Sequence, residues 1–522
     1  MEAAEKRIHI GRRKRQVHFS NIHPIPFIVA KAIQRRVNAY TRGNYPAPLK
    51  ALQVTRNSLV LPRSFSLKQE KKAFLELASG GVAENLVRLH FLREKARKPS
   101  SLRRQGRQPL PRRVLVMGAG VMGSGIAQWF SSRGFQVILK EVHRDVLAKG
   151  MASIRASYGT AVRKKVFTRS QARQGLDRIT PMTSEVSMRN VDLVIEAIVE
   201  DLETKRQVLS QLEARAPSHT LFATNTSALS IMDIGTSFRR PDRLVGMHFF
   251  NPVHRMPLLE IIQGGQTSRR SVSRALAIAR KIGKVPIRVR DRPGFLVNRI
   301  LLPGMIEAVH LYHEGESISA IDRVMSQFGM PMGPLRLIDE VGVDVSRHVA
   351  DDLANRLSTI NQLPDTLTKM VENGLLGRKS GMGFYNHESA PGKPAPNTQL
   401  EEISGTGGNP QLDEQAMQDR MVLSMVNEAA RCLEEGVVSS EQEIDLAMVL
   451  GSGWAPFGGG PLRHAKTRGI PAVIYALNHM ARTISPHFKP SPALAILEGE
   501  GKVMFSTPKT KISPRKSHVH SH

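Results

Sequence analysis

The sequence is poor in cysteine and in long apolar runs. Its 522 residues include one cysteine, Cys432, which excludes an internal disulfide and predicts a reducing, cytoplasmic location. No apolar run approaches the ~20 residues that cross a bilayer, and the N-terminus lacks the apolar stretch of a secretory signal. With 41% hydrophobic residues, the chain is expected to form a globular protein of several domains without a transmembrane segment.

Acidic residues are also scarce relative to basic ones. The chain has 75 Lys and Arg against 45 Asp and Glu, a formal net charge of +30. Residues 1–110 hold 24 of the basic and 6 of the acidic residues, so +18 lies in this leader and +12 in the other 412 residues. Basic runs such as "GRRKRQ" are usually solvated, so we expect a partly disordered leader and no nucleic-acid partner. Nucleic-acid binding by the leader is the alternative.

The hydropathy pattern divides the chain into helical and strand-containing segments. Six apolar runs alternate with amphipathic helices, which predicts a parallel sheet with right-handed crossovers. These runs are "RVLVMG", "QVILKE", "VDLVIEAI", "TLFATN", "RLVGMHFF" and "VPIRVR". The predicted segments are a basic leader and helical connector at 1–110, an α/β domain at 111–291, a helical domain at 292–388, a Pro- and Gly-rich linker at 389–412, a second helical domain at 413–503 and a disordered basic tail at 504–522.

The two helical segments resemble each other. Glu307 aligns with Glu428, Glu314–Gly315 aligns with Glu435–Gly436, and Asp322 aligns with Asp445 after two extra residues. Two unrelated bundles would not share this order of residues, so we interpret them as one duplicated module.

Three glycines, Gly118, Gly120 and Gly123, follow the first strand in "GAGVMG" at the start of a helix. Such a turn lets a pyrophosphate approach the backbone at a helix N-terminus. The second strand ends in Glu141, whose carboxylate can bind an adenosine ribose and disfavours a 2′-phosphate, so NAD is expected rather than NADP. A tight turn without a ligand is the alternative.

Several polar residues lie where strands end in the predicted sheet. His248 lies among apolar residues of "GMHFFNPVHRMPLLEII", and Glu260 follows twelve residues later. If the two meet, the carboxylate orients the imidazole as a base. Ser227 and Asn298 lie beside a turn and a helix start, where such residues more often cap a helix or satisfy loop hydrogen bonds. A core histidine and ordinary loop contacts are therefore the alternatives.

Together these motifs resemble the 3-hydroxyacyl-CoA dehydrogenase family, and more closely the dehydrogenase part of the bacterial multifunctional fatty-acid oxidation α-subunit. The segments "GAGVMGSGIA", "EAIVED", "NTSALSI", "PGFLVNR", "GMPMGP" and "GRKSGMGFYNH" occur in the family's order over about residues 110–500. The resemblance implies a Rossmann-type parallel-sheet domain followed by two related all-α domains. It also implies NAD-dependent oxidation of L-3-hydroxyacyl-CoA to 3-ketoacyl-CoA in fatty-acid β-oxidation, with the active site between the sheet and the first helical domain.

The resemblance also implies roles for individual residues. His248 would be the general base, Glu260 would orient it, and Ser227 and Asn298 would bind the reacting oxygen and the thioester. Ser157 and Lys164 lie where related enzymes contact CoA, and no metal ligands are expected. The expected cofactor-binding residues are Gly118, Gly120, Met122, Gly123, Glu141, Ile198, Val199, Glu200, Lys205, Asn251 and Lys379.

Three departures from the family pattern qualify these expectations. The hydratase/isomerase domain that precedes the dehydrogenase part in the α-subunit is missing, so no hydratase activity is expected. His464 stands where the family has a tyrosine near the substrate, and residues 1–40 match nothing in the family. The duplicated module fits internal pairing in place of a homodimer interface, or docking of a thiolase subunit in an oligomer. The remaining alternatives are a short-chain 3-hydroxybutyryl-CoA enzyme and an inactive scaffold that binds nucleotide or thiolase.

Overall fold

The computed structural model describes residues 25–98, 110–389, 394–404 and 412–499. The disorder expected in part of the leader (1–110) and in the tail (504–522) falls partly or wholly outside these ranges. Within them, no helix is both long enough and apolar enough to cross a bilayer.

Eight strands form one sheet in the order β3-β2-β1-β4-β5-β6-β7-β8. Their apolar side chains are buried on both faces, as expected for strands covered by helices on either side. The strands are β1 (Arg113–Met117), β2 (Gln136–Lys140), β3 (Ile179–Met182), β4 (Leu193–Glu196), β5 (Leu221–Thr224), β6 (Leu244–Phe249), β7 (Leu258–Gln263) and β8 (Val285–Arg290).

The sheet is mostly parallel, which confirms the predicted fold class with one correction. Strands β3 and β7 are absent from the six that the sequence predicted, and β7 runs antiparallel to β6. The reason is the short connection at 250–257, because a parallel crossover needs a dozen or more residues and usually a helix. The expectation of an entirely parallel sheet is therefore wrong at β7.

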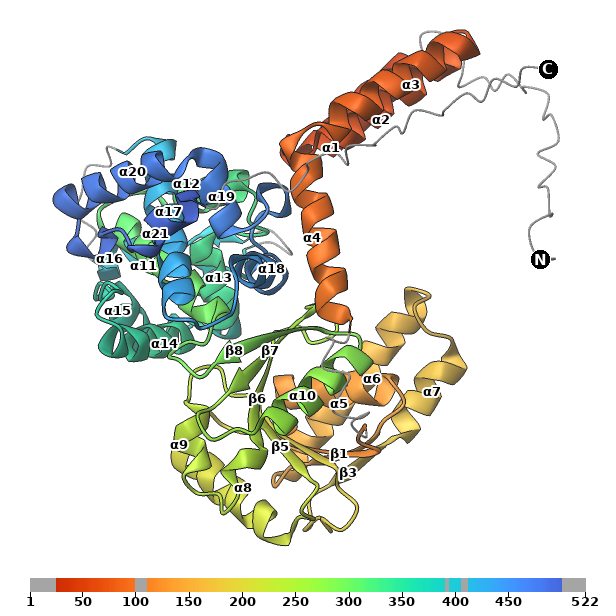
Figure 1. Ribbon diagram of the computed structural model, residues 1–522, viewed down its shortest axis with the longest axis vertical. Coiled ribbons are helices and arrows are strands. Elements are labelled where there is room, and N and C mark those ends of the chain that lie inside the picture. Colours follow the sequence, from red (N-terminus) through yellow and green to blue (C-terminus); the bar gives the residue numbers. More distant parts are fainter. Residues whose placement is uncertain (1–24, 99–109, 390–393, 405–411, 500–522) are drawn as a thin grey trace, which may run out of the picture.

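Helices cover both faces of the sheet, as Figure 1 shows. The side chain of Leu115 packs into one apolar core, whereas those of its neighbours Val114 and Val116 pack into the other, so β1 separates two cores. The helices of this part are α5 (Val121–Ser132), α6 (Arg144–Arg163), α7 (Arg169–Asp177), α8 (Leu202–Arg215), α9 (Ile231–Gly235) and α10 (Arg269–Lys281).

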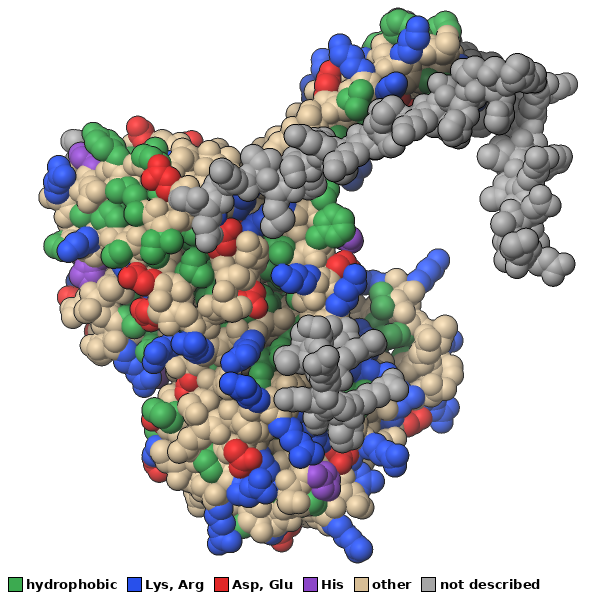
Figure 2. Space-filling view, in the orientation of Figure 1, with side chains coloured by type: hydrophobic (Ala, Val, Ile, Leu, Met, Phe, Trp, Pro, Cys, Tyr) green, Lys and Arg blue, Asp and Glu red, His purple; other side chains and the backbone are tan. Residues whose placement is uncertain are grey.

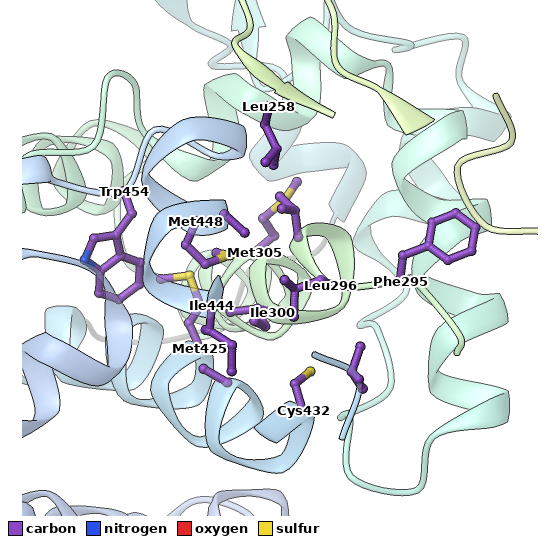
Figure 3. Close-up of a cluster of buried hydrophobic side chains, with 14 of the residues drawn as sticks. Leu258, Phe295, Leu296, Ile300, Met305, Met425, Cys432, Ile444, Met448 and Trp454 are labelled. Atoms are coloured by element: carbon purple, nitrogen blue, oxygen red, sulfur yellow. The ribbon is translucent and has the colours of Figure 1, made fainter. Parts of the chain in front are cut away.

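The described residues after β8 are mainly helical. Their central pair is α11 and α17, which pack against each other around an apolar cluster that includes Ile300, Met305, Met425 and Met448 (Figure 3). The first module contains α11 (Val297–His313), α12 (Ile318–Phe328), α13 (Pro334–Val341), α14 (Val343–Arg356) and α15 (Thr366–Glu372). The short elements β9 (Tyr385–Asn386), β10 (Ala395–Pro396) and α16 (Leu400–Ser404) follow. The second module contains α17 (Glu414–Glu434), α18 (Glu441–Gly451), α19 (Pro461–Arg468), α20 (Ile470–Thr483) and α21 (Ala493–Gly499).

The sequence repeat corresponds to a repeated structure. Asp322 on α12 accepts backbone hydrogen bonds from Leu335 and Arg336 at the start of α13, with distances of 2.9 and 3.1 Å. Asp445 on α18 accepts the equivalent bonds from the second and third residues of α19, at 2.9 and 3.3 Å. Each aspartate thereby satisfies amide groups that have no partner within their own helix.

Four helices precede the sheet: α1 (Ile25–Thr41), α2 (Pro46–Val60), α3 (Arg63–Ala78) and α4 (Gly81–Arg97). Helices α1 to α3 project from the body, and α4 runs back toward the sheet (Figure 1). Their solvent-facing surface carries many Lys and Arg side chains and some apolar ones (Figure 2). Arg88 on α4 pairs with buried Asp445 at 2.8 Å, which fixes α4 to the second helical module.

His464 lies between the two helical modules. Its ring packs edge-on against Phe328 and Trp454, with ring centroids 5.3 and 6.2 Å away. Leu337 occupies the equivalent position of the first module, four residues after the glycine that precedes α13. Burial, and then the charge of Arg468, lower the pKa of His464 from its ordinary 6.5 to about 4. The imidazole therefore serves as a neutral packing group.

Substituting His464 by leucine should make the protein less sensitive to acid. Because the folded-state pKa is lowered, the unfolded chain binds more protons between pH 6.5 and pH 4, so the parent loses stability as the pH falls through this range. The free energy of unfolding of His464→Leu, minus that of the parent, should be about 2 kcal/mol larger at pH 5 than at pH 7.5. Urea denaturation at both pH values measures this, and an unchanged difference would show that His464 is protonated equally in both states.

Candidate active site

The glycine-rich turn joins β1 to α5. Gly118 has a φ of +95°, and a Cβ there would lie 2.4 Å from the carbonyl oxygen of Ala197. A Cβ on Gly123 would lie 1.9 Å from the carbonyl oxygen of Gly118. A Cβ on Gly120, by contrast, would meet no atom within 4 Å. Packing of the turn therefore explains Gly118 and Gly123, whereas Gly120 leaves open space at the N-terminus of α5.

Glu141 closes the same end of the sheet. One oxygen of its carboxylate accepts the Ala119 N–H at 3.1 Å, and the other accepts the Val142 and His143 N–H groups. The carboxylate is thus held against the glycine-rich turn, at the carboxyl end of β2. Open backbone at a helix N-terminus beside a fixed carboxylate fits the pyrophosphate and ribose of a dinucleotide. Met122 on α5 and Ile198 after β4 are half-buried beside this turn, and Val199 is exposed.

A buried ion cluster lies after β4. Lys205 donates to Glu196 at 2.6 Å and lies 3.1 Å from Glu200, and the side chains of Lys205 and Glu196 are 1% and 0% exposed. Glu200 also accepts the N–H of Ser227 at 2.8 Å and the hydroxyl of Thr226 at 2.5 Å. Burial raises the pKa of Glu200, but Lys205, Thr226 and Ser227 outweigh it, so the net shift is downward. The cluster fixes the loop that carries Ser227.

His248 and Glu260 meet across the antiparallel pair of strands. The β6–β7 register places the two residues directly opposite each other, and Nδ1 of His248 lies 2.7 Å from Oε2 of Glu260. The other oxygen of Glu260 accepts the Val297 N–H at 3.0 Å. Both side chains are buried, and the rings of Phe250 and Phe295 pack beside the imidazole. Within the described chain, Nε2 of His248 makes no hydrogen bond to a protein group, so this nitrogen is available to a substrate.

Asn298 and Ser227 meet beside this pair. The side-chain amide of Asn298, at the start of α11, donates to the carbonyl oxygen of Ser227 at 3.1 Å. Phe295, in the connection from β8 to α11, has a φ of +54°. A left-handed backbone on a non-glycine residue costs about 1 kcal/mol or more and persists only where the surroundings hold it. The start of α11 is therefore a constrained part of the site.

The other predicted residues lie on α6, in the turn between β6 and β7, and beside the first helical module. Ser157 is half-buried on α6 and Lys164 is exposed at its end. Burial, followed by the charges of Arg255, Lys284 and Lys164, lowers the pKa of His254, which places Lys164 near the turn between β6 and β7. Asn251 is exposed at the start of that turn. Lys379 pairs with Asp344 at 2.5 Å in the first helical module, so its role toward a cofactor stays a prediction.

Some residues of the site are absent from the sequence-based set. Asn225 accepts the Phe249 N–H at 2.9 Å, which connects the end of β5 to the end of β6. Thr226 belongs to the ion cluster described above. The signal that could have found both residues is position, since they lie just after the carboxyl end of β5.

Three features at one sheet edge define the class of this protein: a glycine-rich strand–helix turn, a carboxylate at the end of the second strand, and a histidine–glutamate pair. They are the features of a dinucleotide-dependent oxidoreductase with a Rossmann-type domain and a helical domain.

Comparisons with known proteins identify the family. Residues 113–292 match the NAD-binding domain of 3-hydroxyacyl-CoA dehydrogenase, and residues 294–387 match the C-terminal domain of the same enzyme. A solved (S)-3-hydroxybutyryl-CoA dehydrogenase from Ralstonia eutropha is 36% identical with a TM-score of 0.50; the match covers 52% of this chain and 98% of that one. The chain belongs to the 3-hydroxyacyl-CoA dehydrogenase family, as the sequence motifs predicted, and its α/β part is that family's NAD-binding domain.

Two further relatives extend the similarity. The solved 3-hydroxybutyryl-CoA dehydrogenase from Escherichia coli is 27% identical with a TM-score of 0.65, and the match covers 75% of this chain and 98% of that one. The fatty acid oxidation complex subunit alpha of Acinetobacter baumannii is 39% identical over 437 residues, which is 82% of this chain and 61% of that protein. The chain thus spans about three fifths of the length of that relative.

Proposed function

We propose that this chain is an NAD-dependent L-3-hydroxyacyl-CoA dehydrogenase of fatty-acid β-oxidation. The reaction converts a 3-hydroxyacyl-CoA and NAD⁺ into a 3-ketoacyl-CoA, NADH and a proton. The observation that carries the proposal is the buried His248–Glu260 pair, whose free imidazole nitrogen lies at the same sheet edge as the glycine-rich turn. The names of the relatives support the substrate class.

The geometry assigns a role to each side chain of the pair. With Nδ1–H donating to Glu260, Nε2 of His248 would be the nitrogen that takes the proton of the 3-hydroxyl group. The Val297 N–H holds the other oxygen of Glu260, so the carboxylate cannot rotate away. Bound NAD supplies the acceptor for the hydride from C3. Ser227 and Asn298, which meet through the Ser227 carbonyl oxygen, would bind the substrate oxygens beside His248.

The remaining predicted residues divide between the two ligands. Gly120 and Glu141 would contact the pyrophosphate and the adenosine ribose, and Lys205 would hold Glu200 beside the nicotinamide end. Ser157 and Lys164 on α6 would contact CoA, since the ammonium of Lys164 offers a cation to its phosphates.

The test is NADH oxidation by the purified chain with acetoacetyl-CoA and with a long-chain 3-ketoacyl-CoA. We expect turnover with at least one thioester, and the ratio of the two rates distinguishes a 3-hydroxybutyryl-CoA enzyme from a long-chain one. NADH binding without turnover of either thioester would favour the alternative of an inactive scaffold. Hydration of crotonyl-CoA by the same preparation tests the expectation that this chain lacks hydratase activity.

We also propose a cytoplasmic location and assembly with further subunits, including a thiolase. The single cysteine is buried, as suits a reducing compartment, and the relative from Acinetobacter baumannii is named as a subunit of a complex. Co-purification of the tagged chain with a thiolase from its own cells tests the assembly.

A further inference from the structure

Two buried arginines form matching ion pairs across the two helical modules. Arg299, on the first turn of α11, binds Glu428 at 2.7 Å and Glu435 through two bonds of 2.6 and 2.7 Å, both acids lying at the far end of α17. Arg420, near the start of α17 in the second module, binds two acids of the first module, Glu307 and Glu314. Each arginine precedes its own module's glutamates by 8 and 15 residues, so the duplication has produced two equivalent connections.

Only one of these connections adjoins the candidate active site. Arg299 follows Val297, whose N–H binds Glu260, and Asn298, whose side chain binds the Ser227 carbonyl. The residue before Arg420 is Asp419, which pairs with Arg468 on α19, within the second module. The two arginines are alike in burial, with side chains 0% and 4% exposed, but they differ in what they hold.

A second contact fixes the same segment from the same side. The N–H of Arg290, at the end of β8, donates to the Val437 carbonyl oxygen at 2.8 Å, just after α17. The connection from β8 to α11 is therefore attached to the second module at both ends. Phe295 lies between these attachments with its left-handed backbone and its ring against His248. This arrangement is able to hold an unfavourable backbone conformation in place.

We propose that the second helical module is a positioning element of the active site and acts through Arg299. Held by Glu428 and Glu435, Arg299 keeps the start of α11 where Val297 orients Glu260 and Asn298 meets Ser227. The module contributes no group to the reacting atoms in this scheme. The inference rests on the proposed dehydrogenase function and explains why a duplicated module is retained beside a site formed by the first.

Matched lysine variants of the full chain test the proposal. Lysine keeps the positive charge but lacks the planar guanidinium group that donates two hydrogen bonds to Glu435. We expect Arg299→Lys to lower kcat for acetoacetyl-CoA reduction at least about tenfold, with unchanged NADH affinity, because small displacements of reacting groups have effects of this size. Arg420→Lys should stay within about twofold of the parent. The proposal would be overturned if both variants lost kcat equally, or if the loss of kcat in each matched its fall in melting temperature.

A second pair of variants is less prone to misfolding. Glu435 and Glu314 are the outer acids of the two connections, with side chains 41% and 45% exposed, so either can be changed to glutamine without burying an unpaired charge. Glu435→Gln should reduce kcat more than Glu314→Gln does.

Amide hydrogen exchange gives a readout that needs no turnover. Exchange at Val297 should accelerate in Arg299→Lys and stay unchanged in Arg420→Lys. If the parent chain reduces neither acetoacetyl-CoA nor a long-chain 3-ketoacyl-CoA, the proposed function fails, yet this exchange measurement still decides the positioning role. Unchanged exchange in Arg299→Lys would overturn it.

Discussion

Replacing His248 with glutamine should lower kcat for acetoacetyl-CoA reduction about a thousandfold while NADH binds as in the parent. A positioned general acid–base contributes roughly 10² to 10⁴ in rate, and glutamine has no group that exchanges a proton near neutral pH. Glutamine can still donate an amide hydrogen to Glu260, which lies 2.7 Å from the imidazole, so the fold around the pair should be maintained. Stopped-flow or steady-state NADH oxidation gives kcat, and quenching of NADH fluorescence gives its dissociation constant.

The control for this variant is another histidine beside the same sheet. His219 precedes β5 at its amino end, where it lies 3.3 Å from Asp192, and it is exposed. His219→Gln should retain the parent kcat within about twofold, as surface substitutions usually do. If His248→Gln kept more than a tenth of the parent rate, another group would have to serve as the base.

The companion variant Glu260→Gln separates orientation from proton transfer. The imidazole remains, but its Nδ1–H faces an amide instead of a carboxylate, so the tautomer and the ring position are less well fixed. We expect a loss smaller than that of His248→Gln, about a hundredfold in kcat. An equal loss in the double variant and in His248→Gln alone would show that the two residues work as one unit.

Local signals in the sequence were sufficient to predict that the glycine-rich turn and Glu141 lie together. The three glycines and Glu141 lie within 24 residues of one another, and a strand–turn–helix places them together whatever the rest of the chain does. The same holds for the duplicated module, because equal spacing of acidic residues is visible without knowing where the helices pack. The alternation of apolar runs with amphipathic segments likewise predicts the sheet.

The meeting of His248 and Glu260 depended on a feature that the pattern does not specify. The segment that forms β7 is a short apolar run between prolines and glycines, and its direction depends on the length of the 250–257 turn. A register shift of one residue would have turned Glu260 to the other face of the sheet. The edge strand β3 was missed for a different reason, since "ITPM" is only four residues long and contains a proline.

Long-range ion pairs were the least predictable part. Lys379 lies in a family motif, but its partner Asp344 is 35 residues earlier and belongs to the helical module. Arg299 and Glu435 are 136 residues apart, and neither has a local pattern that links it to the other. Such contacts follow from the packing of α11 against α17, which only the folded chain establishes.

Replacing Gly120 with alanine should abolish tight NADH binding without unfolding the protein. Its φ of −65° suits any residue, and a Cβ there meets no atom within 4 Å, so the substitution should cost at most about 1 kcal/mol at this helix N-cap. The same open space is where a pyrophosphate would approach the N-terminus of α5. We expect the dissociation constant of NADH to rise about a hundredfold, equivalent to about 2.7 kcal/mol.

Gly123→Ala supplies the contrast that makes this result decisive. Its Cβ would lie 1.9 Å from the Gly118 carbonyl oxygen, so the strand and the helix must move apart, at a cost of about 3 kcal/mol. Gly123→Ala should therefore melt at a lower temperature than Gly120→Ala. Once corrected for the unfolded fraction, the NADH affinity of Gly123→Ala should be higher than that of Gly120→Ala. If Gly120→Ala bound NADH like the parent, the open space would not be part of the nucleotide path, and the turn would be explained by packing alone. Because one glycine of this turn is required by the fold and the other is not, the pair distinguishes a nucleotide site from a ligand-free turn.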